Sequence, residues 1–252
     1  MKFKYTNNIN SKFYLKDNKF SKKNPKFIAK EIGRILSKNL KNLNKNKIVN
    51  FIDIGCANGS LIEYLKTISL NVNFIGTDIE KAFIKYCKKN IPNSEFYLDD
   101  LRKKPNKLLP LANIIFLSGV HSHFDNPEIY LNGCIKRCSK NSKIIIHGLF
   151  NPHNVDVLIK YKKSNDYDIK KNIIDQTGWN MFSITTIKKL LKKNKKIRNF
   201  KFIKIKFPNR LKVKKNSKNP IRSWTQNILK QKFFINGLNL VQHQYFLIIN
   251  LR

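Results

Sequence analysis

A turn with two glycines and an acidic residue ends the first apolar run of the chain. The turn reads Asp53-Ile-Gly-Cys-Ala-Asn-Gly59, and the apolar run that leads into it covers 48–54. Glycine lets the main chain of such a turn approach a ligand closely. Asp53 would repel a pyrophosphate, whereas its carboxylate attracts a cationic group. The turn therefore predicts a site for a ligand that carries a positive charge.

A second acidic residue, Asp78, ends the next apolar run, 19 residues after Gly59. An acid about 20 residues after a glycine turn can accept hydrogen bonds from the ribose hydroxyls of a nucleoside. A dinucleotide-binding turn would place a third glycine where this chain has Ser60. The two features together favour a nucleoside with a cationic group over a dinucleotide.

Several segments resemble, in order and spacing, the motifs of the class I S-adenosylmethionine-dependent methyltransferases. Asp53–Gly59 is similar to the first motif, with Ala57 where the family often has glycine. Segments similar to the second motif, the third motif, the fourth strand with its loop, and the approach to the fifth strand are 74–78, 96–101, 113–125 and 139–147. The resemblance covers 48–150 and implies an enzyme that transfers a methyl group from S-adenosylmethionine.

The resemblance also implies which residues hold the cofactor. In the third motif of the family an acid contacts the adenine amino group; Asp100 fits that place better than Asp99, and both stay open. The full set of candidate cofactor-binding residues is Asp53, Gly55, Cys56, Ala57, Gly59, Asp78, Ile79, Asp99, Asp100, Leu101 and Ser118.

Candidate catalytic residues follow the fourth strand, where the family places the loop beside cofactor and acceptor. A hydroxyl acceptor benefits from a general base with a pKa near neutrality, which points to His121 or His123. The sequence does not choose between them, and each histidine can equally be a hydrogen-bonded structural residue. No group of residues has the spacing of a metal site.

Two polar segments are candidates for binding the acceptor. Asn151 and His153 follow the fifth strand, and Trp179 and Asn180 precede a helix. An aromatic ring beside an amide can form a platform for a substrate, although a tryptophan can also simply fill a core. These segments faintly resemble methyltransferases encoded with surface-polysaccharide genes.

The elements that must position these residues alternate between strand and helix. This alternation predicts an α/β fold with a doubly wound, mostly parallel seven-stranded sheet, Rossmann-like, with helices on both faces. We expect strands at 48–54, 72–77, 95–98, 112–117, 143–147, 200–207 and 243–251, helices at 25–42, 60–67, 79–89, 127–138, 154–162, 183–192 and 222–231, and a basic loop at 210–219. An N-terminal lead-in and helix would occupy 1–45 and the cofactor-binding domain 46–252, with substrate-facing inserts around 150–183 and 208–232.

The strongly positive net charge of the chain has two possible explanations. The net charge is +36, yet only seven of the 51 basic residues are Arg, and Lys, Asn and Ile are abundant, as A/T-rich codons would produce. A surface selected for a polyanion remains the alternative. The four cysteines are expected to be reduced thiols in or near a core. With no long apolar run and no secretory signal, we expect a cytoplasmic protein without a membrane span.

The leading functional hypothesis is O-methylation of a small molecule or a glycan precursor. An RNA methyltransferase that uses the basic surface is the first alternative, although the fourth strand lacks the Asn/Asp-Pro-Pro-aromatic motif and no Pro-Cys pair is present. A non-catalytic module that binds the cofactor is the second, since fold alone does not establish function.

Overall fold

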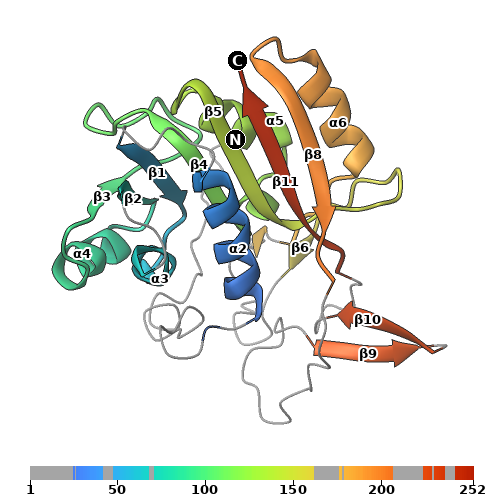
Figure 1. The fold of residues 1–252 in the computed structure, drawn as a ribbon. Coiled ribbons are helices and arrows are strands. Elements are labelled where there is room, and N and C mark those ends of the chain that lie inside the picture. Colours follow the sequence, from blue (N-terminus) through green and yellow to red (C-terminus); the bar gives the residue numbers. More distant parts are fainter. Residues whose placement is uncertain are drawn as a thin grey trace, which may run out of the picture.

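A seven-stranded sheet forms the centre of the computed structural model (Figure 1). The structure describes residues 25, 27–41, 48–67, 71–161, 176–177, 179–206, 224–228, 230–235 and 242–252. The strand order is β3-β2-β1-β4-β5-β11-β8. The strands are β1 (Val49–Ile54), β2 (Val72–Asp78), β3 (Glu95–Leu98), β4 (Ala112–Ser118), β5 (Cys138–Leu149), β8 (Ile197–Lys204) and β11 (Gln244–Leu251).

The sheet is mixed because one strand runs against the others. β1 to β5 pair in parallel, whereas β11 lies antiparallel between β5 and β8. The carboxyl ends of β1, β2, β4 and β5 and the start of β11 therefore meet at one edge. The predicted Rossmann-like fold with a mostly parallel seven-stranded sheet is confirmed.

Helices cover both faces of this sheet and divide the core in two. Buried side chains of α2 (Phe27–Lys41), α3 (Ser60–Lys66) and α4 (Lys81–Asn90) pack on one face. Those of α5 (Pro127–Ile135) and α6 (Ile184–Lys193) pack on the other. A side chain caps each of these last two helices: Asn126 accepts a hydrogen bond from Glu128 N, and Ser183 accepts one from Thr186 N. Figure 1 shows α2 crossing in front of the sheet.

The face under α2 changes from apolar to polar toward the carboxyl edge. Alternate residues of a strand point to the same face, and here Phe51 packs on Phe74 and Phe116, with ring centroids 5.6 and 6.4 Å apart. The last residues on this face are polar, and we call them the polar edge: Asp53, Asp78, Ser118, His147 and Gln244. Polar side chains at the end of an apolar face mark the place where this fold binds ligands.

Two predicted helices are wrong. Within 154–162, Val157 and Met181 exchange backbone hydrogen bonds of 3.0 and 2.9 Å, and β6 (Lys160–Tyr161) pairs with β7 (Gln176–Thr177). The backbone groups that a helix would use are thus bonded to a segment distant in the chain.

The second wrong helix, predicted at 222–231, is a hairpin. β9 (Trp224–Ile228) and β10 (Gln231–Ile235) pair antiparallel, with Ile228 opposite Gln231. Lys230, at the turn, has φ of 62°, which a right-handed helix does not contain. The expected basic loop at 210–219 and most of the lead-in at 1–45 lie outside the described residues. Among the described helices, none has the length and apolarity to cross a membrane.

Candidate active site

The glycine turn after β1 is held by the neighbouring strand and by the loop after β4. The backbone amides of Gly55 and Cys56 both donate to the carbonyl of Thr77, at 2.8 and 2.9 Å. Gly55 has φ of 74°, a conformation that glycine adopts without strain. A Cβ at this residue would lie 2.4 Å from Cγ2 of Val120, so a side chain there would displace the loop after β4.

Asp78 shapes the same turn from the end of β2. Its Oδ2 accepts a hydrogen bond from the amide of Ala57 at 3.0 Å, and its Oδ1 accepts one from the amide of Glu80 at 2.9 Å. Burial raises the pKa of Asp78, and the two amide bonds oppose this rise. Asp53, at the end of β1, is also buried. Two carboxylates therefore lie beside the turn in a chain that is strongly cationic elsewhere.

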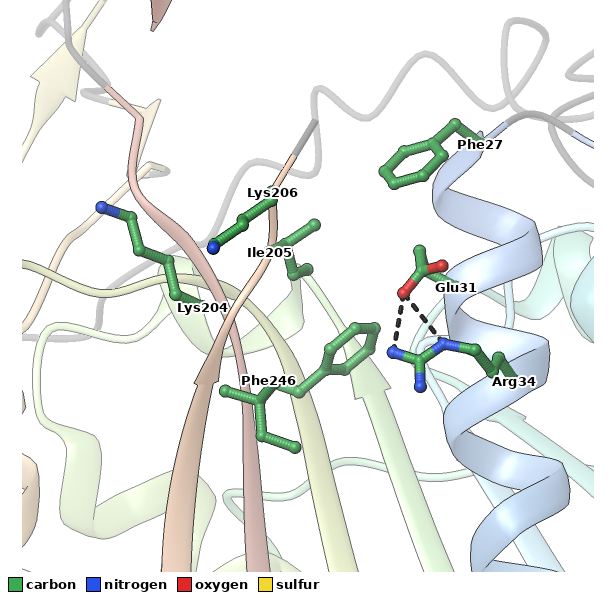
Figure 2. A pocket seen from close by; sticks show the side chains of 8 residues that line it. Phe27, Glu31, Arg34, Lys204, Ile205, Lys206 and Phe246 are labelled. Atoms are coloured by element: carbon green, nitrogen blue, oxygen red, sulfur yellow. Dashed lines mark hydrogen bonds and ion pairs between the residues drawn. The ribbon is translucent and has the colours of Figure 1, made fainter. Parts of the chain in front are cut away.

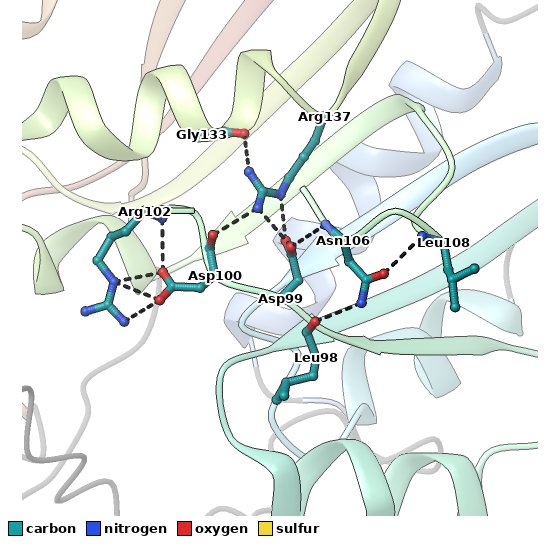
Figure 3. A network of polar contacts seen from close by, with 8 residues as sticks. All are labelled: Leu98, Asp99, Asp100, Arg102, Asn106, Leu108, Gly133 and Arg137. Carbon is teal, nitrogen blue, oxygen red and sulfur yellow. Dashed lines mark hydrogen bonds and ion pairs between the residues drawn. The ribbon is translucent and has the colours of Figure 1, made fainter. Parts of the chain in front are cut away.

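The two acids after β3 have separate surroundings (Figure 3). Asp99 pairs with the fully buried guanidinium of Arg137, with Nε–Oδ2 2.6 Å and Nη2–Oδ1 2.9 Å. Asp100 pairs with Arg102 at the surface, with Nη2–Oδ2 2.7 Å. Burial alone would raise the pKa of Asp100, but the hydrogen bonds and charge of Arg102 outweigh it and lower the pKa. Asp99 is therefore held in the core by Arg137, whereas Asp100 lies nearer the surface.

The remaining candidate residues of the cofactor site differ in exposure. Ile79 is exposed, Ala57, Gly55 and Ser118 are half-buried, and Gly59, Cys56 and Leu101 are buried. A hydrogen bond to Cys87, together with burial, raises the pKa of the Cys56 thiol, so it stays protonated. Leu101 packs against α5, where a Cβ at Gly133 would lie 2.5 Å from its carbonyl oxygen.

The two histidines after β4 lie in different environments. His121, in the short 3-10 helix η1 (Val120–His123), is fully buried and stacks on Phe150 with ring centroids 4.9 Å apart. Its Nε2 contacts the carbonyl of Leu149 at 3.1 Å, and burial lowers its pKa to about 4. This is the geometry of a packed core residue. His123 is exposed, two residues further on.

A third histidine, His147, joins three strands at the polar edge. Its Nδ1 lies 2.9 Å from Oγ of Ser118 on β4, and its Nε2 lies 3.3 Å from Oε1 of Gln244 on β11. His147 is not among the site residues predicted from the sequence. The signal that could have found it is its alternation with Ile145, which puts it on the same face as Asp53 once β5 is extended to Leu149.

The residues predicted to bind the acceptor are tied into the fold to different degrees. Asn180 is fully buried: its Nδ2 donates to the carbonyl of Phe124 and to Asp125, and its Oδ1 accepts from the amide of Ile159. Trp179 is half-buried and has φ of 64°.

The other two predicted acceptor residues form a local turn after β5. Asn151 accepts a hydrogen bond from the amide of His153 at 3.1 Å and donates one to the carbonyl of Val155 at 2.8 Å. His153 is exposed. The structure thus does not bring these two residues and Asn180 together around one described pocket.

The donor set fits a cationic nucleoside. Asp53 ends β1, Asp78 ends β2, and Asp100 follows β3. These three strands are neighbours in the sheet, so the acids line one edge in the order of the first, second and third sequence motifs. A positively charged ligand would offset the cost of burying Asp53 and Asp78. Among the described residues, no group of three or more His, Cys, Asp or Glu side chains could hold a metal ion.

The fold and the carboxylate edge define the class of protein, and comparison with known families agrees. The methyltransferase domain family matches residues 20–195, well over half of the chain, and the chain belongs to this family. A protein of Invertebrate iridescent virus 6 that carries the name methyltransferase 235L is 37% identical over 59 residues, which are 23% of this chain and 22% of the viral protein. The family predicted from the sequence, the class I methyltransferases, is therefore confirmed.

Solved structures show the same fold at low sequence identity. The plantazolicin methyltransferase BpumL, solved with a desmethyl plantazolicin analogue and SAH, has 14% identity and a TM-score of 0.55, with 96% of this chain and 95% of that chain covered. The N-methyltransferase NodS from Bradyrhizobium japonicum WM9, in complex with S-adenosyl-L-homocysteine, has 10% identity and a TM-score of 0.52, with 96% of each chain covered. The citrinin polyketide synthase CMeT domain has 12% identity and a TM-score of 0.55; the match covers 88% of this chain and 51% of that one.

Proposed function

We propose that this chain transfers a methyl group from S-adenosylmethionine to a hydroxyl of a small molecule or a glycan precursor. The observation that carries the proposal is the bonding of the Asp78 carboxylate to the glycine turn, which joins the ends of β1 and β2 into one acid-lined edge. When bound there, S-adenosylmethionine supplies an activated methyl group on a sulfonium. The order of the strands supports adenine near Asp100, ribose near Asp78 and the amino acid end near Asp53.

The protein's own contribution to such a reaction is alignment and exclusion of water. Positioning of an acceptor in line with an activated methyl group supplies much of the rate enhancement. The turn after β1 and the loop after β4 pack together at Gly55 and Val120, so these two walls of the site are in contact. Ser118, half-buried at the end of β4, lies on the same face as Asp53.

A hydroxyl acceptor also needs a group that takes its proton. Of the two histidines predicted from sequence, the exposed His123 has the more suitable position, because the core packing of His121 leaves it no route to a ligand. We favour His147 over His123 as the proton acceptor, since His147 lies on the polar edge and contacts Ser118, whereas His123 lies on the exposed side of η1. The contacts of His147 favour a tautomer with the proton on Nε2, toward Gln244, and a lone pair on Nδ1.

The comparisons leave the acceptor atom open, because the similar structure NodS is an N-methyltransferase. The proposal of a hydroxyl rests on the histidines.

The three buried cysteines and the half-buried Cys138 fit a reducing compartment, which supports a cytoplasmic location. No described contact favours RNA over a small molecule, and the RNA alternative still depends on the net charge alone.

A transfer assay with S-adenosylmethionine labelled on the methyl group tests the proposal. The acceptors would be methyl glycosides, phenols, amines and bulk RNA, and mass spectrometry of the product would identify the methylated atom. We expect label on an oxygen of a small molecule, and loss of transfer in Asp53→Asn but not in Glu128→Gln, a matched loss of an exposed acid. Label in RNA, or on nitrogen or carbon only, would overturn the proposed acceptor class. Cofactor binding with no transfer to any acceptor would favour a non-catalytic module.

A further inference from the structure

A pocket of about 330 Å³ lies between α2 and the carboxyl end of β8, on the same face and edge of the sheet as the polar edge (Figure 2). Its lining residues are Phe27, Glu31, Arg34, Ile203, Lys204, Ile205, Lys206 and Phe246. Small-molecule sites commonly measure about 300–1,000 Å³, so this volume suits a ligand of one ring rather than a polymer.

Two kinds of surface face each other across this pocket. Phe246 on β11 and Ile205 beyond β8 form an apolar wall, and Phe27 closes the pocket at the start of α2 (Figure 2). On α2, the carboxylate of Glu31 accepts hydrogen bonds from Nη2 and Nε of Arg34 at 2.9 and 3.2 Å. The guanidinium of Arg34 therefore offers hydrogen-bond donors to a ligand, and the adjacent carboxylate of Glu31 offers an acceptor.

The pocket is connected to the polar edge through one side chain. The ring of Phe246, which lines the pocket, lies 5.3 Å from the ring of His147, measured between centroids. His147 in turn contacts Ser118 on β4, the strand next to β1. Three strand spacings separate β11 from β1, which is roughly 14 Å. A ligand in the pocket therefore lies beside, and not on top of, the acid-lined edge.

We infer that this pocket is a subsite beside the methyl-transfer position and that it takes one sugar ring of the acceptor; the inference rests on the proposed methyl transfer. The C–H groups on one face of a pyranose pack on an aromatic ring, which here is Phe246 or Phe27. Its neighbouring hydroxyls both donate and accept hydrogen bonds, so they match the carboxylate and guanidinium of Glu31 and Arg34.

Binding of methyl glycosides to the full chain tests this assignment. Saturation-transfer NMR with the methyl glycosides of glucose, galactose, mannose and N-acetylglucosamine would be recorded in the presence of S-adenosylhomocysteine, with phenol as a planar ligand lacking a polyol. We expect at least one glycoside to bind, and its affinity to fall about tenfold or more in Glu31→Gln and in Arg34→Ala. The side chains of Glu31 and Arg34 keep 25% and 60% of their exposure, so these variants should fold.

Two controls separate the failure of this inference from that of the proposed function. Lys38→Ala, an exposed change on the same helix outside the pocket, should leave glycoside binding unchanged. S-adenosylhomocysteine binding, measured by calorimetry in every variant, should also stay unchanged. Normal S-adenosylhomocysteine binding with no glycoside bound, or with glycoside binding insensitive to Glu31 and Arg34, would overturn the pocket assignment alone. Binding of phenol in place of glycosides would overturn the sugar class, and absent S-adenosylhomocysteine binding would overturn the proposed function itself.

Discussion

The carboxylate of Asp78 accepts a hydrogen bond from the backbone amide of Ala57, with Oδ2 and N 3.0 Å apart. This contact joins the end of β2 to the turn that follows β1, although 21 residues separate the two in sequence. Ala57 has φ of 47°, which costs a non-glycine residue some strain, and the bond to Asp78 helps to hold it. The same acid thus shapes the turn and lies where a ribose would bind.

The ion pair between Asp99 and Arg137 should be a source of stability rather than of ligand binding. Removal of one partner of a buried pair costs about 3–5 kcal/mol, because the other charge stays buried without compensation. We therefore expect Arg137→Ala to lower the free energy of unfolding by about that amount in urea denaturation. Arg137 also donates to the carbonyls of Gly133 and Asp100, which adds to the loss.

The surface pair of Asp100 and Arg102 provides the matched comparison. The side chains retain 16% and 30% of their exposure, and pairs of this kind contribute about 0.2–1 kcal/mol. Arg102→Ala should therefore change the free energy of unfolding by less than about 1 kcal/mol. A loss as large as that of Arg137→Ala would contradict this division of roles between the two acids.

Acid should destabilise the protein partly through His121. Its pKa is about 4 in the fold against 6.5 for an ordinary histidine, so the unfolded chain binds a proton that the folded chain excludes. Stability should therefore fall as the pH drops from about 6.5 to about 4, by about 2–3 kcal/mol between pH 7 and pH 4.5.

Urea unfolding of His121→Phe at pH 7 and pH 4.5 checks this expectation. The phenyl ring keeps the stacking on Phe150 and cannot be protonated. The variant should lose about 2–3 kcal/mol less than the wild type over this pH range, whereas His123→Phe should follow the wild type. If His121→Phe kept the full acid loss, another group would be responsible, and the core position assigned to His121 would be in doubt.

The proton acceptor can be identified by comparing His147 with His123. A general base contributes about 10²–10⁴-fold to a rate. With the acceptor found in the transfer assay, we expect His147→Asn to lower kcat at pH 7 by about 100-fold or more. The asparagine can still contact Ser118, and binding of S-adenosylhomocysteine should not change.

The same assay with His123→Asn has a distinct expected result. We expect a change in kcat of less than about threefold, since His123 lies on the exposed side of η1. A large loss in His123→Asn together with near-normal kcat in His147→Asn would place the base in the loop after β4, as the sequence alone suggested.

The sequence predicts the elements whose signal is local. The periodicity of the apolar residues located β1 to β4, and the acids that end β1 and β2 and follow β3 lie at one edge of the sheet, as the sequence predicted. Residues 154–162 and 222–231 were assigned to the wrong type of element because strand pairing with distant segments decides their conformation. A local helical pattern contains no information on such partners.

In the candidate site, too, local motifs are predicted from the sequence and contacts between distant segments are not. The role of His147 depends on Ser118 and Gln244, which lie 29 and 97 residues away in the chain, so no local motif reveals it. The pocket likewise depends on α2 lying against β8 and β11. In the opposite direction, His121 and Asn180 resemble site residues in sequence, but packing buries both completely.

The most direct test of the account is a calorimetric titration of S-adenosylmethionine into the wild-type protein and into Asp78→Asn. Asparagine keeps a carbonyl oxygen for one amide bond but removes the charge, and hydrogen bonds to charged groups contribute about 1.5–3 kcal/mol. We expect the wild type to bind and the Kd to rise about tenfold or more in Asp78→Asn, with Glu128→Gln unchanged and all three proteins folded. An unchanged Kd in Asp78→Asn, or a folded wild type that binds no S-adenosylmethionine, would contradict the assignment of this edge as the cofactor site.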